Sequence, residues 1–195
     1  MPAIDPDRDQ DTIVVGILHP PEWCGSTERF ESEVAAIEAI DPRLETVVVT
    51  YVEPHELRTA RGAPDAGPED LDGLDGPPVS EEDRSTLGRI DVALAIDLPP
   101  DITTLAPNLR WVQAVGSGTA HLQSVGLGDA GITLTSNGGA NSIGIAEFVL
   151  GRLLESAKRF PEIAEAQAEH RWDALYGGQL SGQTIGLIGF GAINR

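Results

Sequence analysis

Two short runs of apolar, β-branched residues with a helical pattern between them constrain the fold more than any other feature. Residues 12–18 form the first run and residues 46–52 the second. Both are short enough to be strands that are buried on two faces, as in a parallel sheet. Over 26–40 the apolar residues recur at helical spacing, with Ser26 or Thr27 as the N-cap. This strand, helix, strand order implies a right-handed crossover and an α/β fold.

The remainder of the chain continues the pattern. We expect strands over 91–96, 109–115, 132–135 and 184–188, and helices after Ser80, over 142–158 and over 161–172. The 142–158 helix, capped by Asn141 or Ser142, has so wide an apolar stripe that we expect it to be covered on more than one side. The Pro-, Gly- and Asp-rich segment near 61–79 predicts a disordered surface loop.

Composition narrows the classes of function. The chain has 31 acidic and 13 basic residues, a net charge of −18, which would repel nucleic acid. No stretch approaches the roughly 18 apolar residues of a membrane span, and the N-terminus lacks the pattern of a signal peptide, so we expect a cytoplasmic protein. Cys24 has no second cysteine to pair with. The four histidines have no metal-ligand spacing, and we expect no metal site.

A glycine turn follows the predicted strand 184–188. Gly189 and Gly191 fit the first two positions of G-x-G-x-x-G, and Asn194 stands at the third. Such a turn lets backbone N–H groups approach a pyrophosphate. The same two glycines are equally compatible with an ordinary turn from a strand to a helix, so these residues alone leave both interpretations open.

Two other glycine turns lie earlier in the chain. Residues 115–119 follow the strand 109–115, so their amides, with the Ser117 and Thr119 hydroxyls, form either an anion-binding nest or a helix-capping turn. Residues 137–141 are typical of a capping loop. Glu147, on the otherwise apolar helix, predicts a buried and hydrogen-bonded carboxylate, which packing explains as well as catalysis does.

The motifs from about residue 90 to 195 stand in an order that resembles the D-isomer-specific 2-hydroxyacid dehydrogenases, a family that includes phosphoglycerate, glycerate and formate dehydrogenases. The motifs are Leu109-Arg110-Trp111-Val112-Gln113 before Gly116-Ser117-Gly118, then Asn137-Gly138-Gly139-Ala140-Asn141-Ser142 with Ala146-Glu147, then Arg171-Trp172, and Leu180-Ser181-Gly182-Gln183-Thr184-Ile185-Gly186 before the glycine turn. One departure is Ala120, where the family often has an aspartate.

The resemblance implies a flavodoxin-like substrate-binding domain over 12–140. Crossing helices and a linker would follow over 141–181, and residues 182–195 would begin a truncated Rossmann domain. The helix 142–158 would mediate a homodimer or another form of self-association. On this basis the chain is expected to be the N-terminal part of a longer enzyme.

The resemblance also implies an NAD-dependent oxidoreductase that acts on the CH–OH group of a small D-2-hydroxy acid or the corresponding 2-oxo acid, with NADP left open. Gly116, Ser117 and Gly118 would bind substrate. The cofactor-binding residues would be Ser117, Gly189, Gly191, Ala192 and Ile193. The family's catalytic arginine, glutamate and histidine would lie beyond Arg195, so we expect the chain to be inactive alone. The alternative is a noncatalytic flavodoxin-like module for binding or dimerisation.

Overall fold

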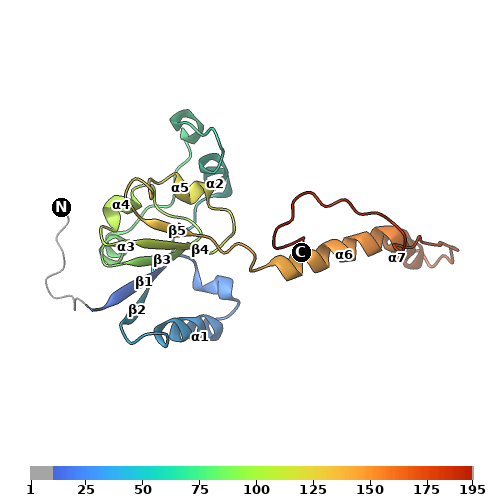
Figure 1. The fold of residues 1–195 in the computed structure, drawn as a ribbon, viewed down its shortest axis with the longest axis horizontal. Helices are drawn as coiled ribbons and strands as arrows, with labels where there is room; N and C mark the ends of the chain where they lie inside the picture. The colour runs from blue at the N-terminus through green and yellow to red at the C-terminus, as the bar shows by residue number, and fades with distance from the viewer. Residues whose placement is uncertain (1–10, 195) are drawn as a thin grey trace. The chain divides into compact units, whose positions relative to one another are not determined.

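The computed structural model describes residues 11–194, which form two compact units divided after Asn137. The first unit contains a five-stranded sheet in the order β2-β1-β3-β4-β5, with every pair parallel (Figure 1). The strands are β1 (Ile13–Ile17), β2 (Leu44–Val48), β3 (Val92–Ala95), β4 (Trp111–Ala114) and β5 (Thr133–Thr135). The predicted α/β class is therefore confirmed.

Helices cover the two faces of this sheet unequally. Helix α1 (Thr27–Glu38) lies on one face, and the helices on the other are α2 (His55–Arg61), α3 (Glu81–Leu87), α4 (Ile102–Leu105) and α5 (Ala120–Gln123) (Figure 1). The strand order reverses direction after β2, and right-handed crossovers then place the later helices on the opposite face from α1. Ser26 caps α1 as predicted, since its hydroxyl accepts from the Arg29 N–H at 3.2 Å.

The core lies between the sheet and the α2–α5 face. Along β3 and β4 every second residue is buried, namely Ala93, Ala95, Val112 and Ala114. Trp111 lies on the other face and is 42% exposed. In β1, by contrast, Val14, Val15 and Ile17 are all buried, as expected for the strand that has neighbours on both sides and helices on both faces.

The second strand is displaced from its predicted position. It spans Leu44–Val48 instead of 46–52, because its ladder with β1 starts at Ile13 opposite Leu44 and ends at Ile17 opposite Val48. Only the Val49 N–H continues the pairing, to the Ile17 carbonyl at 3.0 Å. Val49 and Tyr51 are still buried, so the predicted apolar run includes residues that are buried after the strand has ended.

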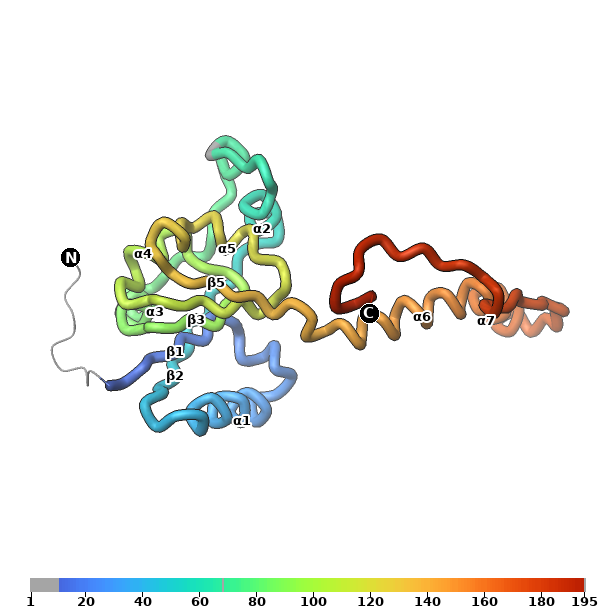
Figure 2. Tube along the Cα trace, in the orientation of Figure 1, coloured from blue at the N-terminus to red at the C-terminus, as the bar shows by residue number. Residues whose placement is uncertain are grey.

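The segment near 61–79 contains more structure than its composition predicts. Helix α2 extends to Arg61, and the one-turn 3₁₀ helix η2 (Pro68–Leu71) follows; another, η1 (Pro21–Cys24), precedes α1. Figure 2 shows this part of the chain running out from α2 and back to the sheet. With α2 it encloses a cavity of about 520 Å³ lined in part by the leucines Leu57, Leu71 and Leu74. Disorder of the segment stays a prediction.

The second unit consists of α6 (Ser142–Lys158), α7 (Phe160–Ala168) and the extended segment that follows. Helix α6 has its predicted bounds, and its C-terminal end is closed by the Gly178 N–H, which donates to the Ala157 carbonyl at 2.7 Å. Glu147 is exposed, so the expectation of a buried carboxylate is wrong. The apolar residues Ile143, Phe148 and Leu150 are 77%, 67% and 55% exposed, so the expected cover on several sides is absent from the described residues.

The expected strand over 184–188 does not form. A parallel strand requires a neighbour for its backbone N–H and C=O groups, and no strand of the described chain pairs with this segment. Ile185, Leu187 and Ile193 instead line, with one side of α6, a shallow apolar hollow of about 320 Å³. Within the described residues, no helix has the length and apolar character needed to cross a bilayer.

The difference in burial between two helical leucines generates a stability prediction. Leu87 in α3 has no exposed surface, whereas Leu150 in α6 is 55% exposed. We expect Leu87→Ala to lower the free energy of unfolding by about 2–5 kcal/mol, because it opens a cavity in the core. Leu150→Ala makes the same change in helix propensity and, at a protein concentration at which the chain is monomeric, should cost less than about 0.5 kcal/mol. Urea titration followed by circular dichroism compares the two; equal losses would contradict the burial described above.

Candidate functional site

The five parallel strands all end at one edge of the sheet, and the segments that follow them lie there together. In open α/β sheets, ligands bind outside this carboxyl edge, at the point where neighbouring strands continue to opposite faces. Here that point lies between β1, which leads to α1, and β3, which leads to α4. The turn with open backbone follows β4, the next strand beyond β3 at the same edge, and the candidate site is built on this turn.

The turn after β4, residues 115–119, contains backbone amides that no group of the described chain uses. Ser117 and Gly118 are exposed, and no hydrogen bond from the amides of Gly116, Ser117 or Gly118 is formed within the described part of the chain. A side chain added at Gly116 or Gly118 would meet no atom within 4 Å, so there is open space in front of both residues. Consecutive free amides of this kind can bind a carboxylate or phosphate.

Asn137, which follows β5, fixes this turn from one side. Its N–H donates to the Gly116 carbonyl at 3.0 Å, and its side-chain amide donates to the Val115 carbonyl at 3.2 Å. The Ser117 hydroxyl in turn donates to the Asn137 carbonyl at 3.4 Å. Sequence reasoning assigned Asn137 to a capping loop and missed this role, because the contact joins two segments about twenty residues apart in the chain.

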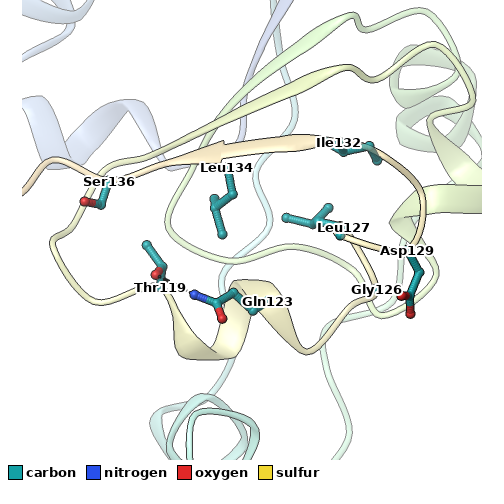
Figure 3. A pocket seen from close by; sticks show the side chains of 9 residues that line it. Thr119, Gln123, Gly126, Leu127, Asp129, Ile132, Leu134 and Ser136 are labelled. Atoms are coloured by element: carbon teal, nitrogen blue, oxygen red, sulfur yellow. Dashed lines mark hydrogen bonds between the residues drawn. The ribbon is translucent and has the colours of Figure 1, made fainter.

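A hollow of about 450 Å³ lies beside the turn, between α5 and β5 (Figure 3). Thr119 and Gln123 line it from the α5 side, and Leu134 and Ser136 line it from β5. The Thr119 hydroxyl accepts from the Gln123 side-chain amide at 3.1 Å. The Ser117 hydroxyl thus uses its proton in the bond to Asn137, whereas the Thr119 hydroxyl acts as an acceptor and keeps its proton, so that Thr119 and the backbone amides are the donors left at this turn.

Buried charges lie behind the turn, and sequence reasoning missed four of them. Asp97, after β3, is fully buried and accepts from Arg58 Nε at 2.7 Å and Nη2 at 2.5 Å. Asp97 also accepts from the Glu53 N–H at 2.9 Å. The Glu53 carboxylate, after β2, is paired with Arg61, and both side chains are almost wholly buried. These four residues have no periodicity or motif, so only the fold brings them together.

His121 in α5 belongs to the same cluster. Its Nε2 lies 2.7 Å from the Ile96 carbonyl and 3.6 Å from Asp97 Oδ1. His121 thus makes structural contacts within the fold. Among the described residues, no group of three His, Cys, Asp or Glu side chains is placed to hold a metal ion.

Burial and pairing raise the pKa of three groups in and beside this cluster. Burial raises the pKa of Glu53, and the neighbouring Arg61 opposes the shift. Burial and the nearby Glu53 carboxylate raise the pKa of Tyr51, so this phenol stays protonated. The hydrogen bonds to Asp97 raise the pKa of Arg58. Arg58 is therefore a fixed positive charge at every pH at which the protein is folded.

The glycine turn of the second unit has a different geometry. Gly189 has φ +88°, a left-handed conformation that other residues adopt only with strain. The Asn194 side-chain amide donates to the Gly189 carbonyl at 3.0 Å, and its N–H donates to the Gly191 carbonyl at 3.2 Å. Asn194 thus closes the turn on itself at the position where the fingerprint has its third glycine.

Known proteins that are similar to this chain belong to one family. No protein-family model matches the chain. Hydroxypyruvate reductase of Thermotoga maritima is 30% identical over 106 residues, which are 53% of this chain and 35% of that protein. Glyoxylate reductase of Thermofilum pendens is 29% identical over 128 residues, 61% of this chain and 38% of that protein. The chain thus spans little more than a third of the length of the curated relatives it matches.

The fold agrees with these relatives. The NAD complex of the NAD-dependent formate dehydrogenase from Staphylococcus aureus aligns with a TM-score of 0.56 and 18% identity, over 93% of this chain and 51% of that one. The two relatives and this enzyme are D-isomer-specific 2-hydroxyacid dehydrogenases. The resemblance to that family is confirmed. The relatives are oxidoreductases, and the structural alignment extends over 93% of this chain.

The contacts of Asn137 predict how the turn responds to its loss. Asn137→Ala removes the side-chain bond to the Val115 carbonyl and keeps the backbone bond to Gly116. We expect a loss of about 0.5–1.5 kcal/mol in unfolding free energy and faster hydrogen exchange at residues 115–119. Asn108→Ala is the matched control, since it removes a comparable bond, to the Gly88 carbonyl, elsewhere in the unit. The assignment fails if both variants affect residues 115–119 equally.

Proposed function

We propose that this chain supplies the substrate-binding half of an NAD-dependent dehydrogenase that oxidises a small D-2-hydroxy acid or reduces the corresponding 2-oxo acid. The observation that carries the proposal is the turn of Gly116, Ser117 and Gly118, which lies at the carboxyl edge of a parallel sheet and whose amides make no hydrogen bond within the described chain. Similarity to a hydroxypyruvate reductase and a glyoxylate reductase supports a small 2-oxo acid as the substrate class.

The residues of the turn bind the substrate carboxylate. The N–H groups of these three successive residues make no hydrogen bond within the described chain, and the open space at Gly116 and Gly118 would let a carboxylate approach the backbone closely. The chain has a net charge of −18, so its surface repels anions in general. An anion would bind only where several donors lie together, as the amides of this turn do.

The glycine turn of the second unit is proposed to hold the cofactor. Gly189 provides the left-handed backbone of a tight turn, and a side chain at Gly191 would meet no atom within 4 Å, so a pyrophosphate has room to approach. Ala192 and Ile193 would contact the pyrophosphate, and Ser117 would contact the nicotinamide. When bound, NAD or NADP supplies the hydride chemistry at its nicotinamide ring.

Carboxylate binding is the first test of the proposal. We expect glyoxylate to shift the amide NMR resonances of Gly116, Ser117 and Gly118, and we expect Gly118→Ala to weaken binding about tenfold by filling the space before the amides. Gly128→Ala is the control, because that glycine also has open space and an ordinary backbone, but lines the hollow beside α5 instead. Shifts confined to the hollow, or none at all, would rule out the turn as the carboxylate site.

Turnover is a separate prediction. The resemblance assigns the catalytic arginine, glutamate and histidine to residues beyond Arg195, and His121 in this chain is bonded to the Ile96 carbonyl instead of facing the turn's amides. We therefore expect the 195-residue chain to bind glyoxylate without oxidising NADH. Loss of NADH absorbance with glyoxylate or hydroxypyruvate, catalysed by the pure chain, would contradict this expectation.

We also propose that the chain self-associates through α6. Its residues Ile143, Phe148 and Leu150 are largely exposed, and burying such a surface is favourable by about 25 cal/mol per Å². Phe148→Glu should shift the mass measured by light scattering toward the monomer. Trp172→Glu is the control, since Trp172 is 95% exposed and lies outside the helix. A wild-type monomer at all concentrations would exclude the association.

A further inference from the structure

Arg61, the last residue of α2, donates hydrogen bonds to the segments that follow β2 and β3 and to the region of α5, which follows the candidate turn in the chain. Its Nη1 donates to the Glu53 carboxylate after β2 and to the Leu98 carbonyl after β3, the latter at 3.2 Å. Its Nη2 donates to the His121 carbonyl at 3.2 Å, and its Nε donates to the Ser124 hydroxyl at 3.1 Å. The guanidinium group of Arg61 therefore links the segments after β2 and β3 to His121 within α5 and to Ser124 at the C-terminal end of α5.

Helix α5 depends on such contacts from outside. It consists of the four residues Ala120–Gln123, and a single helical turn is not stable without tertiary contacts. It begins two residues after Gly118, so any shift of α5 shifts the turn as well. Only Leu122 of the helix is buried in the core. The hydrogen bonds from Arg61 and the contact of His121 with the Ile96 carbonyl supply the remaining restraint.

Burying the charge of Arg61 costs desolvation free energy, so a buried arginine is an unfavourable way to hold α5 if stability is the only requirement. The side chains of Arg61 and Glu53 are 4% and 0% exposed, and Glu53 Oε2 has no hydrogen-bond partner in the described structure. Buried ion pairs are often no better for stability than apolar residues of similar volume. An arginine provides what an apolar residue lacks, namely a rigid planar fork with donors that fix several acceptors at once. Arg61 thus fits a requirement for precise placement better than a requirement for stability.

We propose that Arg61, held by Glu53, is a positioning residue for the Gly116–Gly118 turn. It fixes α5 against the ends of β2 and β3, and so sets the direction in which the turn's amides point. Asn137 fixes the same turn from the side of β5, so the turn lies between two anchors. This inference rests on the proposed function insofar as the positioned amides bind a carboxylate; the restraint itself can be measured without a ligand.

The decisive variant is Arg61→Lys. Lysine keeps the positive charge beside Glu53, but a single ammonium group cannot reach the His121 carbonyl and the Ser124 hydroxyl together. We expect amide hydrogen exchange at residues 116–124 to accelerate about tenfold, with a weaker affinity for glyoxylate. Ser124→Ala is a milder second variant that leaves the ion pair intact and removes the acceptor of Nε, together with the bond that the hydroxyl itself donates to the His121 carbonyl at 2.7 Å. It should accelerate exchange in the same residues by about threefold.

Two controls separate positioning from stability. Arg89→Lys makes the same chemical change in a half-exposed pair with Glu45 and should leave residues 116–124 unaffected. Phe30→Leu lowers stability from α1, on the other face of the sheet, and should speed exchange throughout the first unit. The proposal is overturned if Arg61→Lys resembles Phe30→Leu, with acceleration spread evenly over the unit, or if residues 116–124 do not respond.

The ligand measurement distinguishes this inference from the proposed function. If wild-type protein does not bind glyoxylate while Arg61→Lys still accelerates exchange at 116–124, the positioning role stands and the carboxylate assignment fails. If wild-type protein binds glyoxylate and the Arg61→Lys and Ser124→Ala variants match it in both exchange and affinity, the carboxylate assignment stands and the positioning role fails.

Discussion

The hydrogen-bonded pairing of β1 with both β2 and β3 is the constraint on which the first unit depends. The two ladders are parallel, with Val15 opposite Thr46 on one side and opposite Val92 on the other. Parallel pairing sends every connection back across a face of the sheet, so all strands end at the same edge. The turn after β4, Asn137 after β5 and Asp97 after β3 come together for this reason, although they are distant in sequence.

Local sequence patterns predicted the helices and strands that are specified by residues within the element itself. The apolar run at β1, the Ser26 cap of α1 and the periodic residues of α6 each specify an element through residues within about one helical turn or strand. The family resemblance also follows from short motifs in a fixed order. Exposure could not be predicted in this way: Glu147 was expected to be buried because its neighbours are apolar, but burial depends on what covers α6 and not on the helix itself.

The elements that sequence reasoning missed depend on partners distant in the chain. Glu53 and Asp97 are joined across 44 positions, and Arg61 and Ser124 across 63, with no repeat or spacing to reveal the connection. The segment 184–188 illustrates the opposite error. Its residues have a high propensity for strands, but a strand forms only when it pairs with a neighbour, and the described chain provides no such neighbour. Periodicity thus predicts the faces of elements, whereas buried charges follow from topology alone.

The two glycine turns differ in whether the backbone itself requires glycine, and the difference bears on their functions. Gly189 adopts φ +88°, so its requirement is conformational and would exist in an empty turn. Gly116 and Gly118 have no left-handed backbone, and a side chain at either would meet nothing within 4 Å. The fold alone therefore does not require glycine at these two positions. A requirement there must come from something that approaches the backbone from outside, which is what a bound carboxylate would do.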